Sequence, residues 1–157
     1  MSPLLAFYTG VAPDSRGRTL ADILAWPDNR LEVIHDYIQW LFPLPEASTF
    51  NPAAPLLTDA DIAAFHDQPA VHQALATSLA RMRLFYGLPG DRVRQANWIT
   101  PGNHNYLRLT RILRSLHLLG HDDAARALLR ELEALFKAGA GASIGAPTLG
   151  YWRRAAE

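Results

Sequence analysis

The stretch that most constrains the fold is residues 31–43, LEVIHDYIQWLFP, because apolar residues recur in it at spacings of three and four. On a helical wheel of about 100° per residue most side chains fill one broad apolar face. Four fall outside it: Glu32, His35, Asp36 and Gln39. We expect one helix here, enclosed by others and ended by Pro43. Its narrow polar stripe must then be paired or line a cavity, because a buried polar group without a partner is costly.

The composition is that of an ordinary globular domain of 157 residues, 49% of them hydrophobic. Lys+Arg and Asp+Glu balance at 15 each, so a nucleic-acid partner is not expected. The absence of cysteine excludes a disulfide framework and thiolate metal sites. The first ten residues lack the pattern of a signal peptide, and no stretch approaches the ~18 apolar residues of a membrane span. We expect a cytoplasmic protein without a transmembrane segment.

Helix start and stop signals follow one another along the chain, and no alternating strand pattern appears. Capping pairs predict starts at Thr19 with Asp22, Thr58 with Asp61, and Thr100 with Pro101. Single aspartates predict starts at Asp28, Asp67 and Asp122, and glycines predict ends at Gly87, Gly120 and Gly139. The predicted fold class is therefore all-α: residues 1–157 form a single compact orthogonal bundle of about six or seven helices.

Two long irregular loops are expected between these helices. Residues 43–57 carry four prolines, which prevent a continuous helix. A loop this long is either functional or packed down by its own side chains, here Phe50, Leu56 and Leu57. Residues 88–99 form the second loop. The first residues and the Gly/Ala-rich segment 138–146 are also expected to be irregular, and a last short helix holds Tyr151 and Trp152.

A basic stripe on the predicted helix after Thr100 complements the acidic stripe of residues 31–43. If the two helices are neighbours, Glu32 or Asp36 pairs with Arg108 or Arg111. The contact is then either a closed ion network that fixes helix register or an open pocket, in which the arginines receive a carboxylate and the acids an amine. The candidate ligand-binding residues are Glu32, His35, Asp36, Gln39, Trp40, His104, Arg108 and Arg111.

No catalytic residue, metal site or cofactor is predicted. Glu32, His35 and Asp36 have the chemical types of a proton-transfer set, which keeps an enzyme as an alternative. His117 and His121 have the spacing of two metal ligands on one helix face, but the expected helix end at Gly120 favours two surface histidines. The sequence contains no phosphate-binding loop, dinucleotide glycine fingerprint or nucleophile elbow.

Five strings, in family order over nearly the whole chain, resemble the conserved region of the opioid growth factor receptor family. The most specific is HDYIQWLFP at 35–43; the others are GRTLADILAW at 17–26, STFNPAAPLLT at 48–58, RMRLFYGL at 81–88 and HNYLRLTRIL at 104–113. The resemblance implies an all-α domain. In animal members this domain belongs to a receptor for an opioid pentapeptide ending in methionine, associated with the nuclear envelope.

The resemblance predicts a non-enzymatic, receptor-like module with opioid receptor activity as the family function. Its expected ligand is a short peptide or a small zwitterionic or anionic molecule. A protein-interaction or scaffold domain is the alternative, and an uncharacterised enzyme using His35, Glu32 and Asp36 is the second. Lys137 is the only lysine beside many arginines and alanines, a bias expected of a GC-rich bacterial genome.

Overall fold

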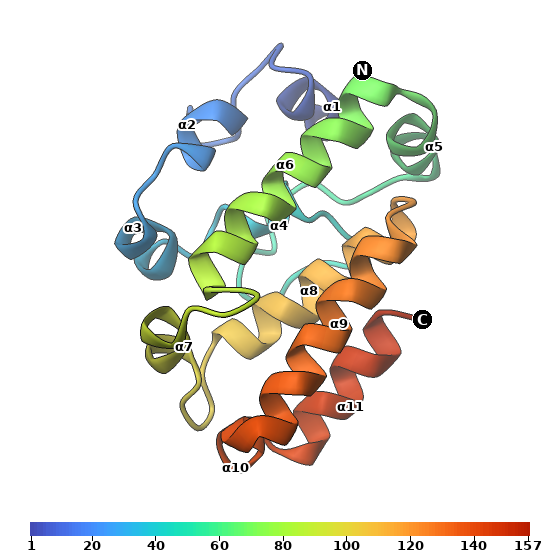
Figure 1. The fold of residues 1–157 in the computed structure, drawn as a ribbon. Coiled ribbons are helices and arrows are strands. Elements are labelled where there is room, and N and C mark those ends of the chain that lie inside the picture. The colour runs from blue at the N-terminus through green and yellow to red at the C-terminus, as the bar shows by residue number, and fades with distance from the viewer. The chain divides into compact units, whose positions relative to one another are not determined.

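The computed structural model describes all 157 residues and contains helices but no β-strand (Figure 1), which confirms the predicted all-α class. Six helices have seven residues or more, in agreement with the predicted six or seven. The chain divides into two compact units, Met1–Arg81 and Met82–Glu157. The single domain expected over residues 1–157 stays a prediction. None of the helices has the length and apolar character needed to cross a membrane.

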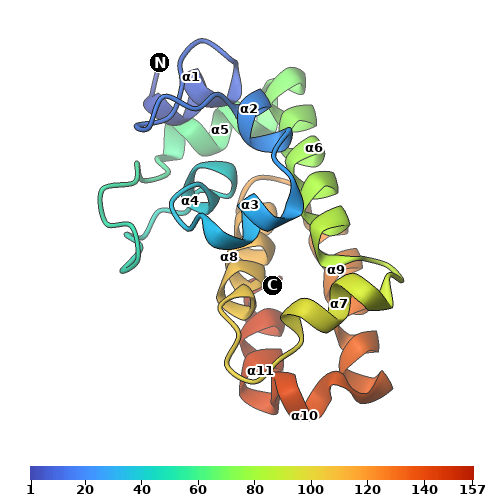
Figure 2. The same ribbon diagram turned by 90° about the vertical axis from the view of Figure 1, so that its left-hand side faces the viewer.

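The first unit holds the helices α1 (Pro3–Tyr8), α2 (Leu20–Leu24), α3 (Asp28–Val33), α4 (Ile38–Leu41) and α5 (Asp59–Asp67), together with most of α6 (Pro69–Tyr86). Figures 1 and 2 both show α1 beside α5. The predicted capping boxes at Thr19 and Thr58 are present: each hydroxyl accepts from the backbone N–H three residues on, and the aspartate there accepts from the threonine N–H.

An aromatic cluster joins three of these helices. The ring centroids of Phe7 and Trp40 are 5.3 Å apart, and those of Tyr8 and Phe65 are 4.9 Å apart, with the rings tilted or edge-on. The hydroxyl of buried Tyr8 donates to the carbonyl oxygen of Leu41 and lies 3.2 Å from the hydroxyl of Ser78. Tyr8 therefore ties α1 to the end of α4 and to α6.

The prediction of one helix over residues 31–43 is wrong, because the chain is non-helical between α3 and α4. The reason lies in two carbonyl oxygens that a continuous helix would use. That of Leu31 accepts from the Tyr37 hydroxyl at 2.6 Å, and that of Asp36 accepts from the Asn51 side chain at 3.3 Å. Ile34 is extended (φ −89°, ψ 130°). Glu32, His35, Asp36 and Gln39 consequently do not share one helix face.

The connection over residues 43–57 is irregular, as predicted, and Figure 2 shows it without any helix. Its ends meet through a backbone hydrogen bond from Leu57 to Leu44 of 3.0 Å. Leu57 is buried, but Phe50 is 77% exposed and Leu56 47% exposed. The expectation that all three side chains pack the loop down is therefore correct only for Leu57.

The second unit contains α7 (Arg92–Trp98), α8 (Asn105–Leu118), α9 (Asp122–Leu135), a π-helical turn (Phe136–Ala140), α10 (Gly141–Ile144) and α11 (Ala146–Ala155). Helices α8, α9 and α11 lie side by side (Figure 1). A row of edge-on aromatic contacts runs from the end of α6 to α11 through Phe85, Tyr86, Trp98, Tyr106 and Trp152. The indole N–H groups of both tryptophans donate to backbone oxygens along this row.

The predicted helix ends at Gly87 and Gly120 are confirmed. Gly87 has φ +68°, and a Cβ there would meet the backbone oxygen of Asp91 at 2.7 Å, so the position requires glycine. The N–H groups of Gly87 and Leu88 donate to the oxygens of Leu84 and Arg83, which closes the last turn of α6. Residues 138–146 were expected to be an irregular connector, but they include the short α10.

Four predicted boundaries near helix starts are wrong. The chain begins with α1 rather than an irregular segment, and the Ser2 hydroxyl caps it. Residues 88–99 include α7, which Asp91 caps through the N–H groups two and three residues on. Asp67 belongs to α5 instead of capping α6. Helix α8 starts at Asn105 rather than after Thr100, because Gly102 has a positive φ of 66°.

Tyr8 gives the fold a testable pH dependence. Burial raises its pKa well above the ordinary value of about 10, against a smaller lowering by the Ser78 hydroxyl. Above pH ~10 the unfolded chain releases this proton while the folded chain keeps it, so stability is fully present below that pH and falls as pH rises further. In urea unfolding at pH 7, Tyr8→Phe should be about 1 kcal/mol less stable than the parent. Above pH ~10 the free energy of unfolding of the parent should fall by ~1.4 kcal/mol more per pH unit than that of the variant, which lacks the phenol. Parallel stability curves would contradict this.

Candidate functional site

An ion network centred on Arg18 surrounds the predicted site residue Asp36 in the first unit. The Arg18 guanidinium lies 2.7 Å from a carboxylate oxygen of Asp14 and 2.8 Å from one of Asp36. The Asp14 side chain is fully buried, and that of Arg18 is 16% exposed. Burial disfavours the charged form of Arg18, but its bonds to Asp14 and Asp36 outweigh this and raise its pKa. Arg16 adds a more exposed contact to Asp36 at 3.2 Å.

Trp26 supports this network from one side. The guanidinium carbons of Arg18 and Arg30 lie 5.4 and 4.5 Å from its ring centroid, distances at which a cation is attracted to an aromatic face. The Tyr37 ring meets Trp26 edge-on at 5.6 Å. Arg81 donates to the backbone oxygen of Trp26 at 2.7 Å, so the end of the unit in α6 is tied to the same residue.

The loop over residues 43–57 reaches the network through Asn51. Its side-chain amide donates to the backbone oxygen of Asp36 and to the side-chain oxygen of Gln39, both at 3.3 Å. The strings at 17–26, 35–43, 48–58 and 81–88 thus meet through Arg18, Asp36, Asn51 and Arg81. These hydrogen bonds and ion pairs hold the four strings together in the folded chain.

The predicted site residues of the first unit have different environments. Asp36 is half-buried and forms ion pairs with Arg16 and Arg18. Gln39 is buried and accepts a hydrogen bond from Asn51. Trp40 is buried and packs on Phe7, so it belongs to the core. Glu32 is half-buried in α3 and His35 is exposed. The structure therefore brings Asp36 and Gln39 together through Asn51.

The other three predicted residues belong to the second unit. His104 is the residue before α8 and is half-buried, Arg108 is buried, and Arg111 is half-buried. The predicted pairing of Glu32 or Asp36 with Arg108 or Arg111 involves residues of different units and stays a prediction. Of the two histidines weighed as metal ligands, His117 contacts Asp122 at 2.6 Å and His121 is buried, so the expectation of two surface histidines is wrong for His121.

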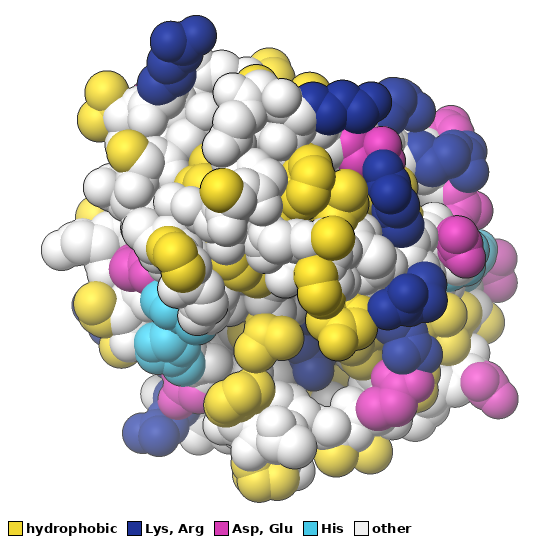
Figure 3. Space-filling view, turned by 90° about the horizontal axis from the view of Figure 1, so that it is seen from below, with side chains coloured by type: hydrophobic (Ala, Val, Ile, Leu, Met, Phe, Trp, Pro, Cys, Tyr) yellow, Lys and Arg dark blue, Asp and Glu magenta, His cyan; other side chains and the backbone are white.

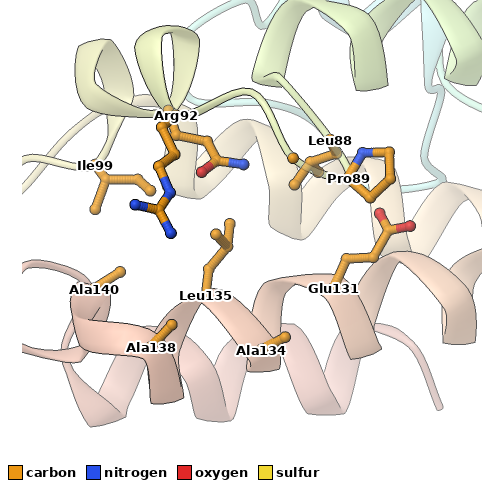
Figure 4. Close-up of a pocket in the computed structure, with 11 residues that line it drawn as sticks. Leu88, Pro89, Arg92, Ile99, Glu131, Ala134, Leu135, Ala138 and Ala140 are labelled. Carbon is orange, nitrogen blue, oxygen red and sulfur yellow. The ribbon is translucent and has the colours of Figure 1, made fainter.

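The second unit has a groove that sequence reasoning did not predict, with a volume of about 720 Å³. Leu88, Pro89 and Arg92 line one wall, and Glu131, Ala134, Leu135 and Ala138 of α9 and the π-helical turn line the other (Figure 4). Figure 3 shows apolar side chains in the middle of one face of the molecule, with arginines and acidic residues along one side. Charges of both signs are thus available near apolar surface.

Several of these residues had a usable sequence signal. Asp14 and Arg18 have the spacing of a helical ion pair, and Asp91 before Arg92 is a helix cap, which would have placed α7 and its side chains. The contact between Asp36 and Arg18 had no sequence signal, because the two residues are 18 positions apart and the helices α2 and α3 lie between them. The groove residues also had no sequence signal, because their proximity depends on how α7 and α9 pack.

Both units are all-α, and in the first unit buried polar contacts join residues of the strings that carry the family resemblance. Residues 5–152 match the family model of the opioid growth factor receptor (OGFr) conserved region, and the chain belongs to this family. The opioid growth factor receptor of Rattus norvegicus is 36% identical over 80% of this chain, and that of Homo sapiens is 34% identical over 82%. The opioid growth factor receptor-like protein 1 of Mus musculus is 35% identical over 64%.

The match covers only part of each relative. The chain spans 24% of the length of the rat receptor and of mouse receptor-like protein 1, and 21% of the human receptor. No solved structure matches the chain significantly.

The ion network predicts unequal effects for its two arginines. Arg18→Ala leaves the buried Asp14 carboxylate without its guanidinium partner and should cost ~3 kcal/mol, as is usual when one side of a buried pair is removed. Arg16 is 71% exposed, so Arg16→Ala is the matched control and should cost less than ~1 kcal/mol. Urea unfolding at pH 7 measures both, and equal losses would show that the network is not organised around Arg18.

Proposed function

We propose that the protein is a non-enzymatic, receptor-like module that binds a short peptide or a small zwitterionic molecule. The observation that carries the proposal is membership of the opioid growth factor receptor family over residues 5–152. Relatives over 80% of this chain are named as receptors for an opioid growth factor. A peptide with a free amine, a free carboxylate and apolar side chains is the ligand class that this relationship favours.

The residues predicted from the sequence are one candidate site for this ligand, and the groove of the second unit is another. At the first candidate site, the guanidinium groups of Arg108 and Arg111 supply the donors for a carboxylate, because a guanidinium can donate two parallel hydrogen bonds to it. Glu32 supplies a carboxylate for an amine. Asp36 already accepts hydrogen bonds or ion pairs from Arg16 and Arg18, which balance its charge, and it suits a positioning role better than a ligand contact.

Isothermal titration calorimetry tests the proposed function. An opioid pentapeptide with free ends should bind with measurable heat, and acetylating its amine or amidating its carboxylate should weaken binding because each removes one charge. An unrelated peptide of equal charge is the specificity control. If all four peptides bind equally, or if no heat is measured at millimolar concentration, the protein does not recognise a peptide by its terminal charges. A scaffold role would then be favoured.

A further inference from the structure

The groove of the second unit has a charge at each end and apolar surface between them. Figure 4 shows Leu135 between the guanidinium of Arg92 and the carboxylate of Glu131. Leu88 and Ala134 add apolar surface to the walls. Its volume of about 720 Å³ lies within the roughly 300–1,000 Å³ of typical ligand pockets.

One of the two carboxylate oxygens of Glu131 has no hydrogen-bond donor in the structure. Its Oε1 accepts from Arg83 at 2.6 Å, whereas its Oε2 is buried and has no hydrogen-bond partner. A buried acceptor without a donor is costly, so a ligand that donates an N–H or ammonium group to Oε2 gains that free energy. Because Glu131 lines the groove, its oxygen without a hydrogen-bond donor favours a ligand that carries one.

Arg92 provides the opposite charge. It is exposed, forms no ion pair or hydrogen bond in the structure, and extends from the first turn of α7 into the groove. Since Arg83 already balances Glu131, the groove has an excess positive charge at Arg92. A free guanidinium beside apolar walls favours a carboxylate, which it can bind through two hydrogen bonds.

We propose that this groove binds the carboxyl-terminal part of a short peptide, with the terminal carboxylate on Arg92, an N–H or amine on Glu131 Oε2, and an apolar side chain against Leu135. The inference rests on the proposed function, and it assigns the peptide to residues outside the set predicted from the sequence. Small residues at positions 134 and 138 leave room for the ligand, since both lie in the wall facing α7.

The experiment measures the affinity of the full chain for the free-ended opioid pentapeptide and for its amidated form. Arg92→Ala should weaken binding of the free-ended peptide about 10-fold or more and should leave the affinity for the amidated peptide unchanged. Arg92→Lys should restore binding in part, because lysine keeps the positive charge but cannot donate two parallel hydrogen bonds to one carboxylate. Ala134→Phe, which fills the groove from an exposed helix position, should abolish binding without lowering the melting temperature.

One control variant, together with the binding of the parent protein, separates this inference from the proposed function. Arg130→Ala removes an exposed arginine of α9 that does not line the groove, and it should bind like the parent. If the parent binds the peptide but the Arg92 and Ala134 variants bind equally well, the groove assignment is wrong and the function stands. If the parent binds no peptide, both fail.

Discussion

The contact on which the first unit depends is the one between Arg18 and the buried carboxylate of Asp14. A carboxylate without exposed surface must be matched by a positive charge, and Arg18 supplies it while also binding Asp36. The turn that carries Asp14 and the break between α3 and α4 are therefore fixed against each other. Such a network specifies geometry more than it adds free energy, because desolvation offsets much of the attraction. This explains why four family strings converge on so few polar contacts.

Local signals in the sequence predicted local features well. The capping boxes at Thr19 and Thr58 and the end at Gly87 depend only on neighbouring backbone, and all three are correct. The helical wheel missed the break after α3 because it takes no account of tertiary hydrogen bonds. The side chains of Tyr37 and Asn51 donate to backbone oxygens that a continuous helix would use for its own hydrogen bonds. Of the site, Asp36 was predicted as a polar position, but its true partners could not be, since they come from a turn whose path depends on the tertiary fold.

The two units differ in how completely their charged side chains are paired. In the first unit the charged side chains of Asp14, Arg18 and Asp36 satisfy one another, and Asn51 completes the set. In the second unit the groove leaves Arg92 and one oxygen of Glu131 without partners, beside apolar walls. Satisfied polar networks stabilise a scaffold, whereas unsatisfied groups in a concave site are available to a ligand. This difference is the reason why the groove, and not the network around Arg18, is proposed as the place where a peptide binds.

A two-dimensional ¹H–¹⁵N NMR titration of the isotope-labelled chain with the free-ended pentapeptide tests directly whether the groove is the binding site. If it is, we expect saturable shifts of the backbone signals of Leu88, Arg92, Ala134 and Leu135, and of the Arg92 side-chain Nε–H, while the signals of Arg18, Asp36 and Asn51 stay in place. Saturable shifts confined to Glu32, Asp36, Arg108 and Arg111, with an unchanged groove, would contradict it.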